Sequence, residues 1–61
     1  MIVDIKDASA YFNLGVAYVR QGKLDKAIEA LQRSIELDPD DVHAYNNLDE
    51  AIEAYENAEE L

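Results

Sequence analysis

The sequence predicts an all-α protein, a helix-turn-helix hairpin followed by a third, long C-terminal helix. Apolar residues recur with helical spacing, a turn glycine and a single proline divide the chain into three segments, and a 34-residue shift aligns the first segment with the third. No segment shows the alternation of apolar and polar residues that is typical of a β-strand. With 61 residues, the chain forms one domain with a thin margin of stability.

The first helix is expected over about residues 8–21. Asp7 can cap its N-terminus, because a carboxylate at that position accepts hydrogen bonds from the first-turn N–H groups. Gly22 is expected to end it, since glycine adopts the positive φ of a helix C-terminus without steric cost.

The second helix is expected over about residues 24–37. Asp25 falls in its first turn, where the helix dipole favours an acid. Pro39 separates it from the third segment, because the residue before a proline avoids helical backbone. Its apolar residues fall on one face with spacing i, i+3, i+4, i+7 and i+11: Leu24, Ala27, Ile28, Leu31 and Ile35.

The third helix is expected to begin after Asp40 or Asp41, either of which can cap it. Neither glycine nor proline follows Pro39, so the helix is expected to continue to about Glu59. One side of it carries Tyr45, Leu48, Ile52 and Tyr55.

The chain repeats itself at a spacing of 34 residues. Between residues 7–17 and 41–51, six of eleven positions are identical. We therefore predict three parts: an N-terminal segment, 1–7, that corresponds to the tail of a preceding repeat; a full repeat, 8–41; and a half-repeat, 42–61, that acts as a capping helix. The identical pairs are Asp7/Asp41, Ala10/Ala44, Tyr11/Tyr45, Asn13/Asn47, Leu14/Leu48 and Ala17/Ala51.

The repeat resembles the tetratricopeptide repeat (TPR) family. The resemblance rests on Tyr11-x-x-Leu14-Gly15-x-x-Tyr18, then Ala27-x-x-x-Leu31, then Pro39. Tyr11 stands where the family often has Trp, and Leu31 where it often has Phe. The resemblance implies a helical repeat that binds other proteins and carries no catalytic centre.

Small residues on the first helix predict a close helix contact. Gly15 and Ala17 would let the second helix approach near Ala27. On the third helix, Asp49 replaces the glycine that corresponds to Gly15, so a further helix could pack there only by burying a carboxylate. Glu56 replaces the turn glycine that corresponds to Gly22, so the helix is expected to continue instead of folding back. The residues expected to fill the core around these contacts are Tyr11, Leu14, Tyr18, Leu31, Ile35, Tyr45, Leu48 and Ile52.

The resemblance also implies a protein-binding concave face, formed by the first helices of successive repeats. One family mode clamps a peptide carboxylate with a Lys and two Asn. Only Asn47 matches that clamp, and Phe12 and Val16 replace the other two, so this mode is not expected. The register places Ser9 and Glu53 on this face as well. The residues predicted to bind protein, or to form a self-interface, are Phe12, Asn13, Val16, Val19, Arg20, His43, Asn46, Asn47 and Glu50.

Phe12, Val16 and Val19 make the first helix apolar nearly all round, which calls for burial on more than one side. Three coverings are possible: residues 1–5 folded back, a second copy of the chain, or a foreign peptide. Short repeat arrays are marginally stable alone, so a homo-oligomer, with a dimer favoured, is expected.

Charge narrows the class of partner. Residues 1–33 hold four acids and five bases, whereas residues 34–61 hold ten acids and no Lys or Arg, which together give the net charge of −9. The acidic half would repel phosphate backbones and anionic lipids, so neither nucleic acid nor membrane is an expected partner. Without a signal peptide or an apolar span of about 20 residues, the expected location is cytoplasmic.

Chemistry is not expected. His43 is the single histidine and has no nucleophile at a suitable spacing, and the chain has no cysteine. We expect neither a catalytic residue, a cofactor nor a metal site. Two functions remain open: a TPR-type scaffold that binds protein or peptide, or an engineered or shortened repeat whose only partner is itself, through helix packing or exchange.

Overall fold

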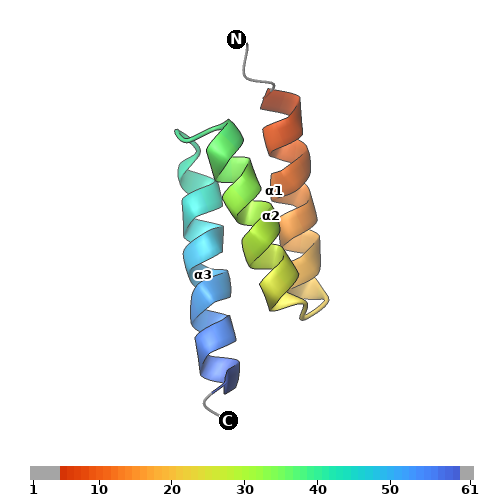
Figure 1. Ribbon diagram of the computed structural model, residues 1–61, viewed down its shortest axis with the longest axis vertical. Coiled ribbons are helices and arrows are strands. Elements are labelled where there is room, and N and C mark those ends of the chain that lie inside the picture. Colours follow the sequence, from red (N-terminus) through yellow and green to blue (C-terminus); the bar gives the residue numbers. More distant parts are fainter. Residues whose placement is uncertain (1–4, 60–61) are drawn as a thin grey trace.

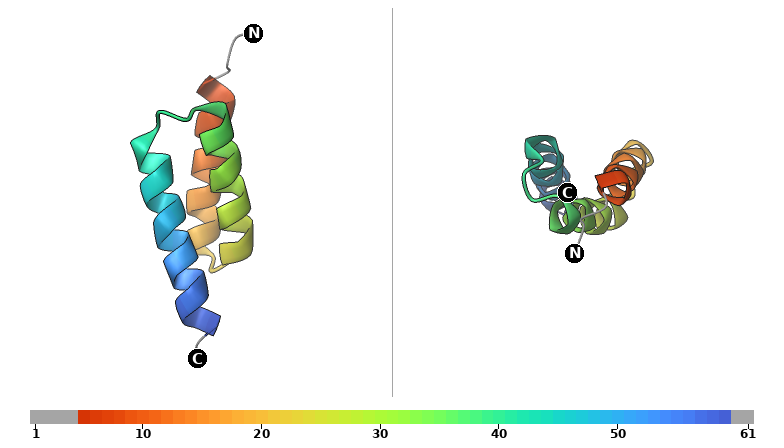
Figure 2. Two further views of the ribbon diagram at one scale, coloured as in Figure 1. Left: turned by 60° about the vertical axis from the view of Figure 1, so that its left-hand side comes forward. Right: turned by 90° about the horizontal axis from the view of Figure 1, so that it is seen from above.

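The computed structural model describes residues 5–59 and confirms the all-α prediction. It contains three helices, α1 (Ile5–Arg20), α2 (Leu24–Leu37) and α3 (Val42–Glu59), and no strand in the described range. Consecutive helices run antiparallel (Figure 1), and α2 packs against both of the others while α1 and α3 hardly touch each other. Seen from above, α1 and α3 flank α2 in a curved layer (Figure 2).

The start of α1 differs from the prediction. The helix begins at Ile5, three residues before Ala8, so Asp7 lies in its first turn and is not the residue that caps it. The 34-residue shift pairs Ile5 with Pro39. Because no proline interrupts the backbone at this end of the repeat, the helix continues where the later copy has a loop.

Gly22 ends α1 as predicted, with φ of +79°. The Gly22 N–H donates to the Val19 carbonyl at 3.0 Å, and the Lys23 N–H donates to the Tyr18 carbonyl at 2.9 Å. These two bonds form a Schellman motif, in which a left-handed residue lets the chain satisfy the last carbonyls of the helix. The chain then reverses directly into α2.

Asp41 caps α3, which confirms one of the two capping residues predicted from the sequence, Asp40 or Asp41. Its Oδ1 accepts hydrogen bonds from the backbone N–H of His43 at 3.0 Å and of Ala44 at 3.4 Å. These are the second and third residues of the helix, whose N–H groups have no partner within it. The short loop and the cap together fix where α3 leaves α2.

The tightest contact between α1 and α2 joins Gly15 to Leu31. Leu31 is fully buried, and a Cβ atom added at Gly15 would lie 2.7 Å from Leu31 Cγ and 2.9 Å from Leu31 Cδ2. Only a residue without a side chain allows this approach. Ala27 is also fully buried, so the predicted contact around these three residues is confirmed.

A buried hydrogen bond holds the other end of the same helix pair. Ser34 is fully buried on α2, and its hydroxyl donates to the Ala8 carbonyl of α1 at 2.9 Å. A small residue fits at this position, and the bond satisfies a hydroxyl that would otherwise be buried without a partner.

Four residues predicted as core or helix-contact residues lie at the surface, so the prediction was wrong for them. They belong to α1 and α3, which are each packed along one side only, against α2. Ala8 and Gly15 provide that side on α1, and Ala44 and Ala51 provide it on α3. The exposed residues are Tyr11 (38%), Leu14 (43%), Tyr45 (45%) and Ala17, whereas Tyr18, Ile35, Leu48 and Ile52 are half-buried.

Gly15→Ala is expected to destabilise the protein by about 1 kcal/mol. Helix propensity favours alanine by about 1 kcal/mol, but displacement of the buried Leu31 side chain costs about 1–3 kcal/mol. In a Leu31→Ala background the clash is gone, so the same change should stabilise by about 1 kcal/mol. Thermal unfolding followed by circular dichroism measures both changes; destabilisation in both backgrounds would contradict the packing described.

Leu14→Ala is expected to cost less than half of what Leu31→Ala costs. Removing the fully buried Leu31 side chain should cost about 2–5 kcal/mol, whereas the exposed Leu14 side chain leaves no enclosed cavity. Urea unfolding at low protein concentration provides the comparison. Equal losses would place Leu14 in the core after all.

Candidate functional site

The concave-face residues predicted on α1 remain accessible. Phe12 and Val16 are half-buried, Val19 is 38% exposed, and Asn13 and Arg20 are exposed. The first three are spaced i, i+4 and i+7, so they form one apolar stripe along the helix. The polar side chains beside the stripe are the amide of Asn13 and the guanidinium group of Arg20.

The residues predicted on α3 are polar and also accessible. His43, Asn46 and Glu50 are exposed, and Asn47 is half-buried. The Asn47 side-chain amide donates to the His43 carbonyl at 2.8 Å, which fixes its orientation along the helix. Its carbonyl oxygen remains able to accept a hydrogen bond from a ligand.

The two sets occupy equivalent positions in the repeat. The 34-residue register pairs Phe12 with Asn46 and Val16 with Glu50. Both helices pack on α2, and the register therefore predicts that equivalent positions share one face of the layer. The α1 half of this face is apolar, and the α3 half offers amides and carboxylates.

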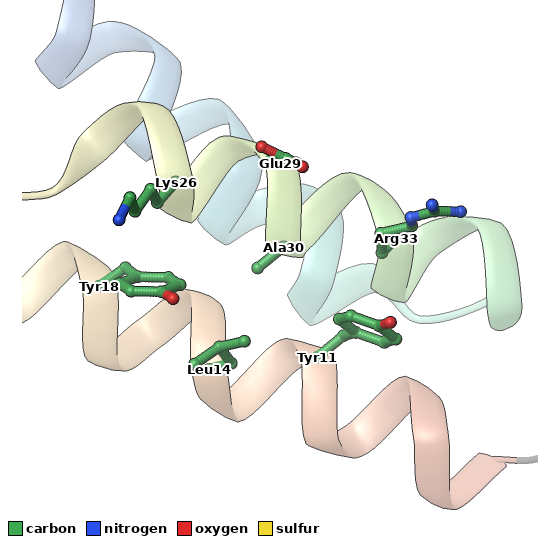
Figure 3. A pocket seen from close by; sticks show the side chains of 7 residues that line it. All are labelled: Tyr11, Leu14, Tyr18, Lys26, Glu29, Ala30 and Arg33. Atoms are coloured by element: carbon green, nitrogen blue, oxygen red, sulfur yellow. The ribbon is translucent and has the colours of Figure 1, made fainter.

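A second surface lies on the other side of α1. A groove of about 370 Å³, which we call the outer groove, lies between α1 and α2, and Figure 3 shows the side chains that line it. Lys26 lies toward its Tyr18 end and Arg33 toward its Tyr11 end. The lining residues are Tyr11, Leu14 and Tyr18 of α1 and Lys26, Glu29, Ala30 and Arg33 of α2.

The outer groove continues along α1 toward its N-terminus. A second hollow of about 340 Å³, lined by Asp7 and Ala10, shares Tyr11 and Leu14 with the groove. Sequence reasoning missed this surface because it assigned those two residues to the core. The repeat register could have indicated it, since Ala10, Leu14 and Ala17 recur as Ala44, Leu48 and Ala51, which require a covering helix.

The possible covering of the apolar stripe by residues 1–5 involves residues 1–4, which lie outside the described part of the chain. Among residues 5–59, no helix is long and apolar enough to cross a membrane. Within the described residues, no group of three His, Cys, Asp or Glu side chains could hold a metal ion.

Comparison with known proteins identifies the repeat. Residues 8–41 match the model of the tetratricopeptide repeat. The chain is 46% identical over 54 residues to the tetratricopeptide repeat domain-containing protein PYG7, chloroplastic, of Arabidopsis thaliana. That alignment covers 88% of this chain but only 17% of the Arabidopsis protein. No solved structure matches the chain.

The matched residues include those that hold α1 and α2 together. Gly15, Ala27, Leu31 and Ser34 all lie within 8–41, and the structure buries each of them. The match spans more than half of the chain and coincides with the helical hairpin. The chain therefore belongs to the tetratricopeptide repeat family, whose members typically serve as non-enzymatic protein-interaction modules.

Proposed function

We propose that this chain is a non-enzymatic scaffold module that binds a protein or peptide through its concave face. The observation that carries the proposal is the accessible apolar stripe of Phe12, Val16 and Val19. Apolar side chains that remain accessible beside polar groups are typical of an interaction site.

The chemistry of the two helices defines the ligand. A peptide that crosses the face would place apolar side chains on the α1 stripe. Glu50 and Glu53 on α3 would attract a basic residue, and the Asn46 amide could hydrogen-bond to the peptide backbone. The same acidic charge disfavours nucleic acid and anionic membranes as partners.

Self-association through helix packing or exchange is the second candidate, favoured by the exposed side chains of Tyr11, Leu14 and Tyr45. It needs no foreign ligand.

A cytoplasmic location and an engineered origin stay predictions from the sequence.

Val16→Glu is expected to weaken peptide binding at least about tenfold, because it places a charge in the apolar contact. The probe is a basic, apolar peptide selected from a random library against this chain and measured by fluorescence anisotropy. Glu50→Lys, at an exposed position that does not support the fold, should weaken the same peptide by repelling its basic residue.

Val42→Glu is the matched control, since Val42 is 66% exposed at the start of α3 and lies outside the predicted face. It should bind the peptide as the parent chain does. Circular dichroism verifies that each variant keeps its helices. Unchanged affinity for both Val16→Glu and Glu50→Lys would refute the concave-face proposal.

A further inference from the structure

The outer groove presents an apolar floor between two positive charges. Leu14 and Tyr11 are 43% and 38% exposed, and Ala30 points toward α1 between them (Figure 3). Lys26 and Arg33 are seven residues apart on α2, which separates them by about 10.5 Å along the helix. Glu29 lies between them and, like the guanidinium group of Arg33, points away from α1 (Figure 3).

The chain itself shows what kind of element such a surface accommodates. The repeat register relates Ala10, Leu14 and Ala17 of α1 to Ala44, Leu48 and Ala51 of α3. On α3 both alanines are buried, at 0% and 1% exposure, because that side packs on the antiparallel helix α2. The same residues on α1 therefore form a seat for a helix that runs antiparallel to α1.

The free edge of α3 carries a stripe that complements the groove. Tyr45, Asp49, Ile52 and Glu56 are spaced i, i+4, i+7 and i+11, so they share one side of the helix. Tyr45 is 45% exposed, Ile52 is half-buried, and both carboxylates are exposed. The two acids are seven residues apart, the same spacing as Lys26 and Arg33.

We propose that the outer groove receives the α3 stripe of a second copy of this chain. With the incoming helix antiparallel to α1, Asp49 meets Lys26, Glu56 meets Arg33, and Ile52 packs over Leu14 between the two charge pairs. This surface is separate from the concave face, so the proposal rests on the second candidate function, self-association, and does not depend on peptide binding.

Charge complementarity favours a second copy over an uncharged helix. Asp49 would lose its hydration against an apolar partner, whereas a cation in the groove compensates for that loss. Arg33 is already within 3.4 Å of Glu36, but both side chains are more than 60% exposed. Such an exposed pair contributes little, so Arg33 can exchange its partner at small cost.

The contact is head-to-tail. The groove is lined by α1 and α2 and the stripe belongs to α3, and α1 and α3 flank α2 in the curved layer (Figure 2). Each added copy leaves one groove and one stripe open, so assembly continues beyond a dimer unless the rotation closes a ring. Average mass should therefore rise with concentration and fall as salt screens the charge pairs.

The test uses light scattering behind a sizing column over about a hundredfold range of concentration. Lys26→Glu with Arg33→Glu, and Asp49→Lys with Glu56→Lys, should each give a monomer at every concentration. An equimolar mixture of the two double variants should associate again, and so should one chain with all four changes, whose net charge equals that of the parent. A parent chain that stays monomeric, or a mixture that does not associate, would overturn the proposal.

A matched control changes the net charge equally but outside the groove. Gln21→Glu, Lys23→Glu and Gln32→Glu alter three exposed residues and shift the charge by the same four units as Lys26→Glu with Arg33→Glu. This variant should associate as the parent does, and circular dichroism verifies its fold. Loss of association in the control, or retention in either double variant, would mean that the copies meet through another surface.

Discussion

The close approach of α1 to α2 at Gly15 determines where every other contact of the protein can form. Leu31 fills the space that a Cβ atom would occupy, with separations of 2.7 and 2.9 Å from that position. The two backbones thereby come near enough for a hydrogen bond on one side of the Gly15–Leu31 contact, where the Ser34 hydroxyl donates to the Ala8 carbonyl. On the other side, the Schellman turn at Gly22 closes the hairpin. Because α2 is held in this way, it can support α3 on its remaining apolar side.

Local signals were sufficient to predict most of the helix ends. Gly22 and Asp41 act through their own backbone and side-chain geometry, which depends on residue type and not on distant contacts. The start of α1 was not predicted because a capping residue was taken to begin the helix. Asp7 is equally suited to the first turn, where the helix dipole favours it, and Ile5 does not break the helix as Pro39 does.

Burial was harder to predict, because it depends on which helices are present to cover a face. Tyr11 and Leu14 have the same apolar pattern as core residues, but a single neighbouring helix covers only one side of α1. The helical spacing of apolar residues indicates that one side of a helix is suited to burial, but it does not specify which neighbouring element covers that side. The outer groove is the physical consequence, and the three residues that α1 contributes to it, Tyr11, Leu14 and Tyr18, had been assigned to the core. The residues assigned to the concave face were predicted from the resemblance together with the repeat register, and that assignment stays a prediction.

The distribution of charge fits a layer with two unlike edges. The only bases of α2 that line the outer groove, Lys26 and Arg33, stand at the edge where α1 leaves apolar surface uncovered. The opposite edge carries Asp49 and Glu56 where glycine stands in the earlier copy of the repeat. A carboxylate at such a position prevents a purely apolar helix from packing there, because the charge would be buried without compensation. It does not prevent packing by a surface that supplies a cation at the same spacing. Under the proposal, the acids that stand in place of these glycines select among partners.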